Sequence, residues 1–227
     1  MIGIIGAMEE EILEIKKLMN KVETISICKL NFYKGFIANK EVVLVKSGIG
    51  KSLSAMSTTL LLSNFDIDFV INIGSAGGLK SSLKTLDTII SKNVAQADFD
   101  LTAFGYKRDF SEKRLSFKAD EKLVNKVKSL NLENVVFGDI VSSDAFISKS
   151  SQVKALEENF ETALCADMEA GSIAMILDHF DKEFIVIRSI SDVVVNSKDN
   201  AIEFKQFLKK ASKQSASICK KLIENIN

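Results

Sequence analysis

The chain has 227 residues, 46% of them hydrophobic and 26% charged, with 30 basic and 30 acidic side chains that balance to no net charge. This length suits one α/β domain over residues 1–227, and no apolar run approaches the length needed to cross a bilayer. The balanced charge, without a basic block, argues against DNA or RNA as a partner.

Apolar, β-rich runs alternate with segments of helical period along the whole chain. The predicted strands are residues 2–6, 24–28, 32–38, 41–47, 68–74, 88–96, 135–143 and 184–191. The predicted helices are residues 9–20, 51–65, 120–131, 151–160, 169–180 and 200–226. Several strands are continuous Val/Ile runs, typical of strands covered on both faces. We therefore predict a three-layer α/β/α sandwich with a mixed central sheet.

Three further features qualify this outline. Residues 97–119 are polar and irregular, which indicates an excursion at the rim of a site or a subunit contact. The N-terminus passes directly from Met1 into a predicted strand, without the pattern of a secretion signal, so we expect a cytoplasmic protein. The cysteines, Cys28, Cys165 and Cys219, lack the spacing of a zinc or redox site, and we expect them to be reduced and structural.

The histidine content limits the chemistry. His179 is the only histidine, in a predicted turn between a helix and a strand. A single histidine excludes Ser-His-Asp triads, multi-histidine metal sites and, at this position, a Cys-His pair. Acid–base chemistry in this chain must therefore use carboxylates.

Ligands of open α/β sheets gather beyond the carboxyl ends of strands, and four predicted strands end in unusual residues. These ends are residues 7–11, 75–78, 144–146 and Asp192, and a fifth segment, residues 167–169, precedes a helix. The first end carries three consecutive acids, Glu9, Glu10 and Glu11. Acids in a first helical turn complement the helix dipole, so a surface cap explains two of the three.

Each of the other ends has a functional and a structural interpretation. The glycine-rich residues 74–78 could bring backbone N–H groups to a ligand, or form a tight strand-to-helix turn; they match neither a dinucleotide fingerprint nor a P-loop. Asp192 could be a desolvated proton donor or a helix N-cap. At residues 167–169, a sugar could lie against Met168 while a neighbouring carboxylate accepts hydrogen bonds from its hydroxyls. Alternatively, Asp167 could cap the following helix, with Met168 in the core.

Taken together, seven segments resemble one family. They are GAMEEE (6–11), SGIGK (47–51), NIGSAGGL (72–79), LTAFGY (101–106), SDAFI (143–147), DMEA (167–170) and RSISDV (188–193). In this order they resemble the bacterial 5'-methylthioadenosine/S-adenosylhomocysteine nucleosidases over essentially the whole chain. The resemblance implies a nucleoside phosphorylase-like fold, usually a homodimer. It also implies hydrolysis of adenine nucleosides with a 5'-thio group, and of 5'-deoxyadenosine, in methionine salvage, with water and without a metal or organic cofactor.

The resemblance also implies residue roles. Asp192 would protonate adenine at N7, and Glu11 would deprotonate the attacking water, which Ser75 and Arg188 would help to order. Glu169 would hold the ribose hydroxyls. The remaining implied contacts are Met168 against the sugar; Phe146 and Ile147 at the base; Ser191 beside Asp192; Met8, Ile49 and Phe204 around the alkylthio group; Ala76, Gly77 and Asp167 elsewhere in the substrate site; and Leu101 and Phe104 from the neighbouring subunit.

The acidic turn distinguishes this reading from its closest rivals. A relative that uses phosphate as the nucleophile needs cationic groups and open backbone donors at the first turn, whereas negative charge there repels phosphate and tolerates water. Asp167 stands where many members of the family carry Glu, and residues 107–119 lack proline, which leaves substrate breadth open. The alternatives are a phosphate-dependent nucleoside phosphorylase, a futalosine-type hydrolase and a non-enzymatic nucleoside-binding module.

Overall fold

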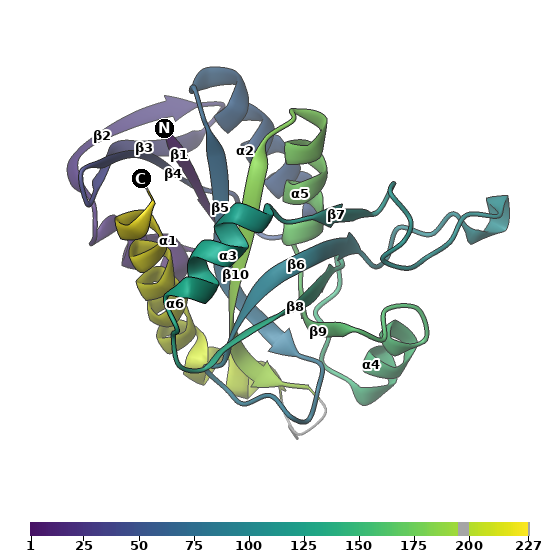
Figure 1. The fold of residues 1–227 in the computed structure, drawn as a ribbon. Coiled ribbons are helices and arrows are strands. Elements are labelled where there is room, and N and C mark those ends of the chain that lie inside the picture. The colour runs from purple at the N-terminus through teal and green to yellow at the C-terminus, as the bar shows by residue number, and fades with distance from the viewer. Residues whose placement is uncertain (195–199, 227) are drawn as a thin grey trace.

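A computed structural model describes residues 1–194 and 200–226, in which helices cover both faces of a central sheet (Figure 1). The strands are β1 (Ile2–Gly6), β2 (Asn20–Ile27), β3 (Leu30–Ile37), β4 (Lys40–Lys46), β5 (Phe69–Gly78), β6 (Thr88–Gln96), β7 (Ser116–Lys118), β8 (Val135–Ser142), β9 (Ala163–Asp167) and β10 (Glu183–Val193). The helices are α1 (Glu9–Lys16), α2 (Lys51–Asn64), the 3-10 turn η1 (Thr102–Phe104), α3 (Glu121–Ser129), α4 (Ser150–Glu157), α5 (Ala170–His179) and α6 (Asn200–Asn225).

The sheet combines parallel and antiparallel pairs, as predicted. β1 runs parallel to β4 and β5, and β5 runs parallel to β10, whereas β2, β3 and β4 form an antiparallel meander. β10 also pairs with β6, and β9 bridges β8 and β5. Because these pairings close a circuit through β5, β10, β6, β8 and β9, one half of the sheet curls into a small barrel while β1, β4, β3 and β2 extend from it.

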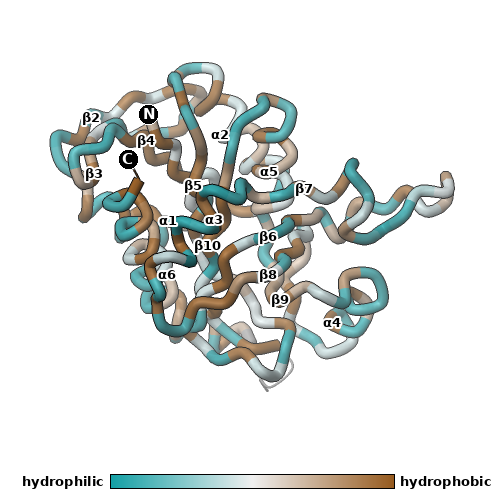
Figure 2. The backbone as a smooth tube through the Cα atoms, viewed as in Figure 1, coloured by the Kyte–Doolittle hydropathy of each residue, from teal (hydrophilic) through white to brown (hydrophobic). Residues whose placement is uncertain are grey.

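Two apolar cores lie on opposite faces of the sheet, which confirms the three-layer prediction. One core packs α1, α3 and α6 against the strands through residues such as Ile12, Val127 and Leu222. The other packs α2 and α5 through residues such as Leu61 and Ile173. All five residues of β1 are buried, as expected for a strand with helices on both sides. Figure 2 shows hydrophobic residues concentrated in the central strands. No helix in the described ranges is long and apolar enough to cross a membrane.

The structure corrects the sequence prediction at two strands and one turn. The short strands β7 and β9 were not predicted, because β9 reads ALCAD and β7 has only three residues, too few for a periodic signal. The glycine-rich residues 74–78 are not a tight turn: β5 continues through Gly78, where it pairs with β10 and β9. A side chain is excluded at Gly74, where a Cβ atom would lie 2.4 Å from Arg188 of β10 and 2.9 Å from Glu11 of α1.

Residues 98–115 form an arm that leaves the end of β6 and returns as β7. In Figure 1 the arm, with η1 near its tip, projects away from the sheet. Its base is held by Arg108, whose Nε donates to the carbonyl of Ala97 at 2.9 Å. The predicted excursion at residues 97–119 is therefore present, and it carries η1 and β7 within it.

Candidate active site

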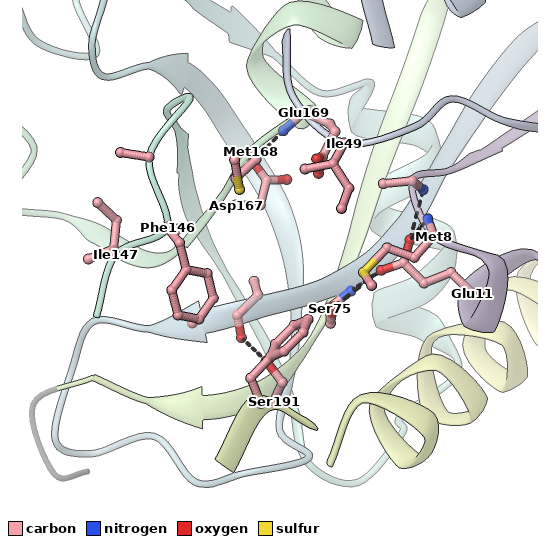
Figure 3. Close-up of a pocket in the computed structure, with 16 residues that line it drawn as sticks. Met8, Glu11, Ile49, Ser75, Phe146, Ile147, Asp167, Met168, Glu169 and Ser191 are labelled. Atoms are coloured by element: carbon pink, nitrogen blue, oxygen red, sulfur yellow. Dashed lines mark hydrogen bonds between the residues drawn. The ribbon is translucent and has the colours of Figure 1, made fainter. Parts of the chain in front are cut away.

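A pocket of about 710 Å³, including its open mouth, lies at the carboxyl ends of β1, β5, β9 and β10. This position is where the sequence predicts a site. The predicted residues that line it are Met8, Glu11, Ile49, Ser75, Ala76, Gly77, Phe146, Ile147, Asp167, Met168, Glu169, Ser191 and Phe204. Figure 3 shows Glu11, Met8 and Ser75 on one side of the pocket and Phe146 and Ile147 on the other.

Glu11 is 3% exposed, and hydrogen-bond donors from two strand ends hold its carboxylate. Its Oε2 accepts from the backbone N–H groups of Ala7 at 2.8 Å and Met8 at 3.0 Å. Its Oε1 accepts from the Ser75 N–H at 2.9 Å and the Ser75 hydroxyl at 3.2 Å. An ionised carboxylate only accepts hydrogen bonds, and these donors fix its orientation. Glu9 and Glu10 are exposed, and Glu9 pairs with Lys46, so the helix-start role expected for them is confirmed.

Arg188 is 1% exposed and lies beneath the pocket, not in its lining. Its Nε donates to Asp167 Oδ2 at 2.6 Å, and its Nη2 donates to Asn72 Oδ1 at 2.8 Å. Burial alone would lower the pKa of Arg188, but the charges of Asp167, Glu11 and Glu169 raise it above its ordinary value. The guanidinium is therefore charged, and its Nη1 is a buried donor without a partner among the described residues.

Gly74 leaves room for the side chains of both Arg188 and Glu11. A Cβ atom on Gly74 would lie 2.4 Å from Arg188 Nη1 and 2.9 Å from Glu11 Oε1. Both atoms therefore occupy the space that a side chain would need. The unpartnered donor and the held carboxylate thus border the same point of β5, without an ion pair between them in the described part of the chain.

Asp167 is 7% exposed, and its side chain is engaged inside the protein. Besides Arg188, its carboxylate accepts a hydrogen bond from the Ser142 hydroxyl and longer ones, at 3.3–3.4 Å, from the backbone of Glu169 and Ala170. The alternative interpretation, in which Asp167 caps the following helix, is thus correct in part, although Asp167 itself ends β9 and α5 begins at Ala170.

Glu169 is 7% exposed and accepts a hydrogen bond from the Gly50 N–H at 2.9 Å. Burial raises the pKa of Glu169 to about 8, with the negative charge of Asp167 adding to the effect; Arg188 and the Gly50 hydrogen bond oppose it. This carboxyl therefore retains a proton at neutral pH.

Asp192 is fully buried within β10, directly opposite Gly77 of β5. A Cβ atom on Gly77 would lie 3.5 Å from Asp192 Oδ2. The Ser191 hydroxyl lies 2.8 Å from Asp192 Oδ1 and 3.2 Å from the carbonyl of Ala76. Because Ser191, Ala76 and Gly77 all line the pocket, the carboxyl of Asp192 stands immediately behind its wall. The helix N-cap interpretation of Asp192 is wrong, since Asp192 lies within β10, which continues to Val193.

An aromatic pair borders the pocket. The rings of Phe146 and Phe204 meet edge to face, with centroids 5.6 Å apart. Phe146 is 41% exposed and Ile49 is 52% exposed, so part of the apolar wall faces the mouth. These surfaces suit a flat, largely apolar ligand group.

Leu101 and Phe104 do not line this pocket. Both are on the arm, and Phe104 is 78% exposed at the end of η1.

The sequence interpretation missed several residues at the site. Ala7, Ala145 and Ala166 line the pocket but carry no distinguishing chemistry. Asn72 and Ser142 hold Arg188 and Asp167 from below. Asn72 had a usable signal, because it is an amide inside the otherwise apolar run of β5. In residues 1–194 and 200–226, no three His, Cys, Asp or Glu side chains are grouped so that they could hold a metal ion.

Comparison with known proteins places these observations in context. The family model described as "Phosphorylase superfamily" matches residues 1–224. A 5'-methylthioadenosine/S-adenosylhomocysteine nucleosidase of Staphylococcus haemolyticus is 42% identical over 228 residues, 99% of each chain. The solved structure of the S. pneumoniae nucleosidase with a transition-state inhibitor has a TM-score of 0.94 at 31% identity, covering 100% of this chain and 99% of that one. The Neisseria meningitidis nucleosidase in complex with methylthio-immucillin-A has a TM-score of 0.93 at 34% identity, covering 99% of each chain.

Proposed function

Because the chain belongs to the phosphorylase superfamily, and within it to the 5'-methylthioadenosine/S-adenosylhomocysteine nucleosidases, we propose that Asp192 and Glu11 divide the catalysis between them. The enzyme is a hydrolase that cleaves the N-glycosidic bond of both nucleosides, releasing adenine and the 5-thio-substituted ribose. The assignment of its residues rests on their positions around the pocket.

The reaction needs opposite electrostatic support at its two ends. As the glycosidic bond breaks, negative charge moves into the base and the sugar becomes oxocarbenium-like. Asp192, held by Ser191 behind the wall, protonates adenine at N7. Phe146 stacks on the base, and the backbone of Ile147 reads its edge. Acid–base assistance of this kind typically contributes about 10²–10⁴-fold.

Glu11 positions and deprotonates the attacking water. The observation that carries this role is the convergence of Glu11 Oε1, the Ser75 hydroxyl and the unpartnered Arg188 Nη1 around Gly74. The Ser75 hydroxyl makes the longest of the four contacts to Glu11, so a water molecule can take its place between them. Arg188 then donates to the same water.

The sugar and its 5' group occupy the remaining walls. Glu169 accepts hydrogen bonds from the ribose hydroxyls, and Met168 packs against the sugar. The alkylthio group lies at an apolar end of the pocket formed by Met8, Ile49 and Phe204. This apolar end also accommodates the 5' methyl group of 5'-deoxyadenosine. Asp167, with its carboxylate engaged by Arg188 and Ser142, acts on the substrate through Arg188 and is a positioning residue.

The charge of the pocket favours water over phosphate. Its lining in the described chain includes three acidic side chains, Glu11, Asp167 and Glu169, of which Glu169 keeps its proton at neutral pH, but neither lysine nor arginine. The nearby cation, Arg188, is already paired with Asp167. An anionic nucleophile would meet the carboxylate of Glu11 without a free cation in the lining. A carboxylated 5' group of the futalosine type would meet an apolar end of the pocket instead of a cation.

The test is an assay of purified enzyme with methylthioadenosine in phosphate-free buffer. We expect release of adenine and methylthioribose, no acceleration by added phosphate, and losses of at least about 100-fold in kcat for Glu11→Gln and Asp192→Asn with unchanged circular dichroism. Dependence on phosphate, a strong preference for futalosine-type nucleosides, or near-normal rates in both variants would contradict the proposal.

We further propose that the enzyme is a cytoplasmic homodimer in which Leu101 and Phe104 reach the pocket of the neighbouring subunit. The projection of the arm and the 78% exposure of Phe104 support this arrangement. The three cysteines are free, as expected in a reducing compartment, although Cys28 is exposed.

A further inference from the structure

Three charged side chains outside the pocket connect three segments that border it. Lys51 begins α2, directly after the loop that carries Ile49. Asp98 lies at the base of the arm, and Asp144 begins the loop that carries Phe146 and Ile147. We call Lys51, Asp98 and Asp144 the rim cluster.

The contacts within the rim cluster are short and mutually reinforcing. Lys51 Nζ lies 2.5 Å from Asp98 Oδ1. The other oxygen, Asp98 Oδ2, accepts the backbone N–H of Asp144 at 2.9 Å. Asp144 Oδ1 in turn accepts the backbone N–H of Lys51 at 2.8 Å. Each residue therefore contacts the other two, and hydrogen bonds with a charged partner are stronger than neutral ones.

The cluster also completes the start of α2. The N-cap residue of α2 is Gly50, which has φ +92° and no side chain to cap the helix. A Cβ atom on Gly50 would lie 3.0 Å from Asp144 Oδ1, so glycine allows this carboxylate to approach the helix end. Asp144 supplies from 93 residues away the negative group that a local N-cap would provide.

The consequence concerns residues 144–147, which we call the Phe146 loop. Residues 144–147 are exposed or only partly buried, and Phe146 is 41% exposed, so core packing does little to hold them. Asp144 is fixed to Asp98 through its backbone and to α2 through its side chain, at the residue where this loop begins. On the other side of the same junction, the Gly50 N–H is bound to Glu169. We infer that the rim cluster positions the Phe146 loop relative to Ile49 and Glu169, and thereby sets the affinity for the nucleoside.

This inference rests on the proposed placement of adenine against Phe146. The rim cluster touches neither water nor the reacting bond in that arrangement, so its loss should weaken substrate binding and leave the chemical step intact. A purely structural role would instead lower thermal stability and kcat together.

The experiment compares Lys51→Met, Asp98→Asn and the conservative Lys51→Arg with a matched control, Lys34→Met. Lys34 forms an ion pair with Glu41 at 3.0 Å on the β3–β4 hairpin, and both side chains are about as exposed as Asp98. We expect KM for methylthioadenosine and Kd for adenine to rise 3- to 10-fold in Lys51→Met and Asp98→Asn, with kcat within twofold of wild type. Lys51→Arg and Lys34→Met should stay within twofold for all three constants.

Either of two results would overturn the inference: KM and Kd unchanged in Lys51→Met and Asp98→Asn, or a fall in kcat that parallels a lower Tm. Failure of the proposed function is distinguishable, because wild-type enzyme would then release no adenine from methylthioadenosine, or Asp192→Asn would stay active. If the wild-type enzyme is active, Asp192→Asn is inactive, and the rim variants have wild-type KM and Kd, then the inference is wrong while the proposed function stands.

Discussion

The guanidinium of Arg188 occupies the space where a side chain on Gly74 would be, with Nη1 only 2.4 Å from the position of a Cβ atom. Glu11 Oε1 lies 2.9 Å from the same position. The absence of a side chain at residue 74 thus leaves room for both the buried cation and the proposed base. We expect Gly74→Ala to displace both and to lower kcat/KM by about 100-fold or more, since misplacement by about 1 Å can have this effect.

Gly78→Ala is the matched control for Gly74→Ala. It lies four residues further along β5, where a Cβ atom would meet its nearest neighbours at 3.4–3.5 Å, an ordinary contact. Steady-state kinetics and thermal melts of the two variants should show a large activity loss only in Gly74→Ala. Equal activities would mean that the placement of Arg188 and Glu11 around Gly74 is unimportant.

Asp167 provides a second test, because its ion pair with Arg188 is only 1% exposed on both sides. Asp167→Asn removes the negative partner and leaves a buried guanidinium uncompensated, which typically costs about 3–5 kcal/mol of stability. We expect the free energy of unfolding in urea to fall by this order and kcat to fall at least tenfold, because Arg188 loses its orientation. A variant with wild-type stability and a raised KM alone would instead indicate direct contact between Asp167 and substrate.

The protonation of Glu169 predicts how stability depends on pH. Its pKa is about 8 in the folded protein and 4.5 in an ordinary environment, so between these values the folded protein keeps a proton that the unfolded chain has lost. Stability associated with this carboxyl is therefore full below about pH 4.5 and is lost as pH rises through about 8. Glu169→Gln cannot ionise, and its stability relative to wild type should increase between pH 5 and 8.5 by at most about 1.4 kcal/mol per pH unit.

Urea denaturation at several pH values would measure this difference, with Glu10→Gln as the control. Glu10 is an exposed acid in the first turn of α1, and its replacement should leave the pH dependence unchanged. Parallel stability curves for wild type and Glu169→Gln would show that Glu169 ionises normally in the folded state.

We proposed that the arm of each subunit places Phe104 in the pocket of the other subunit, an arrangement called here the exchange of arms. It can be tested by complementation between variants. Phe104→Ala should raise KM for methylthioadenosine by about tenfold or more, because burial of a Phe side chain contributes about 1.5–3 kcal/mol and about 1.4 kcal/mol is a factor of ten. In a mixed dimer with Asp192→Asn, the Phe104→Ala subunit keeps its own acid and receives an intact Phe104 from its partner. That dimer should recover wild-type KM at one of its two sites.

The control mixes Phe104→Ala with a chain that carries both substitutions. No subunit then supplies Phe104, and KM should remain high. Recovery in this control, or a monomeric protein by light scattering, would exclude the exchange of arms.

The sequence by itself determined the order of the elements and the type of chemistry. Continuous apolar runs such as β1 and the helical period of α5 are local properties, so their bounds were predicted to within one or two residues. The single histidine restricted acid–base chemistry to carboxylates. The strand ends also indicated where the site residues would lie, because parallel strands carry their carboxyl ends to one edge.

Only the tertiary structure decided which of these groups meet and what each one is free to do. Asp167 and Glu169 are two residues apart, yet one is bound to Arg188 and Ser142 while the other faces the pocket with a raised pKa. In the sequence Gly74 is compatible with a turn, whereas in the fold β10 brings Arg188 across it. These outcomes depend on register and burial between segments about 20 to 180 residues apart, and local sequence patterns carry no information about such distances.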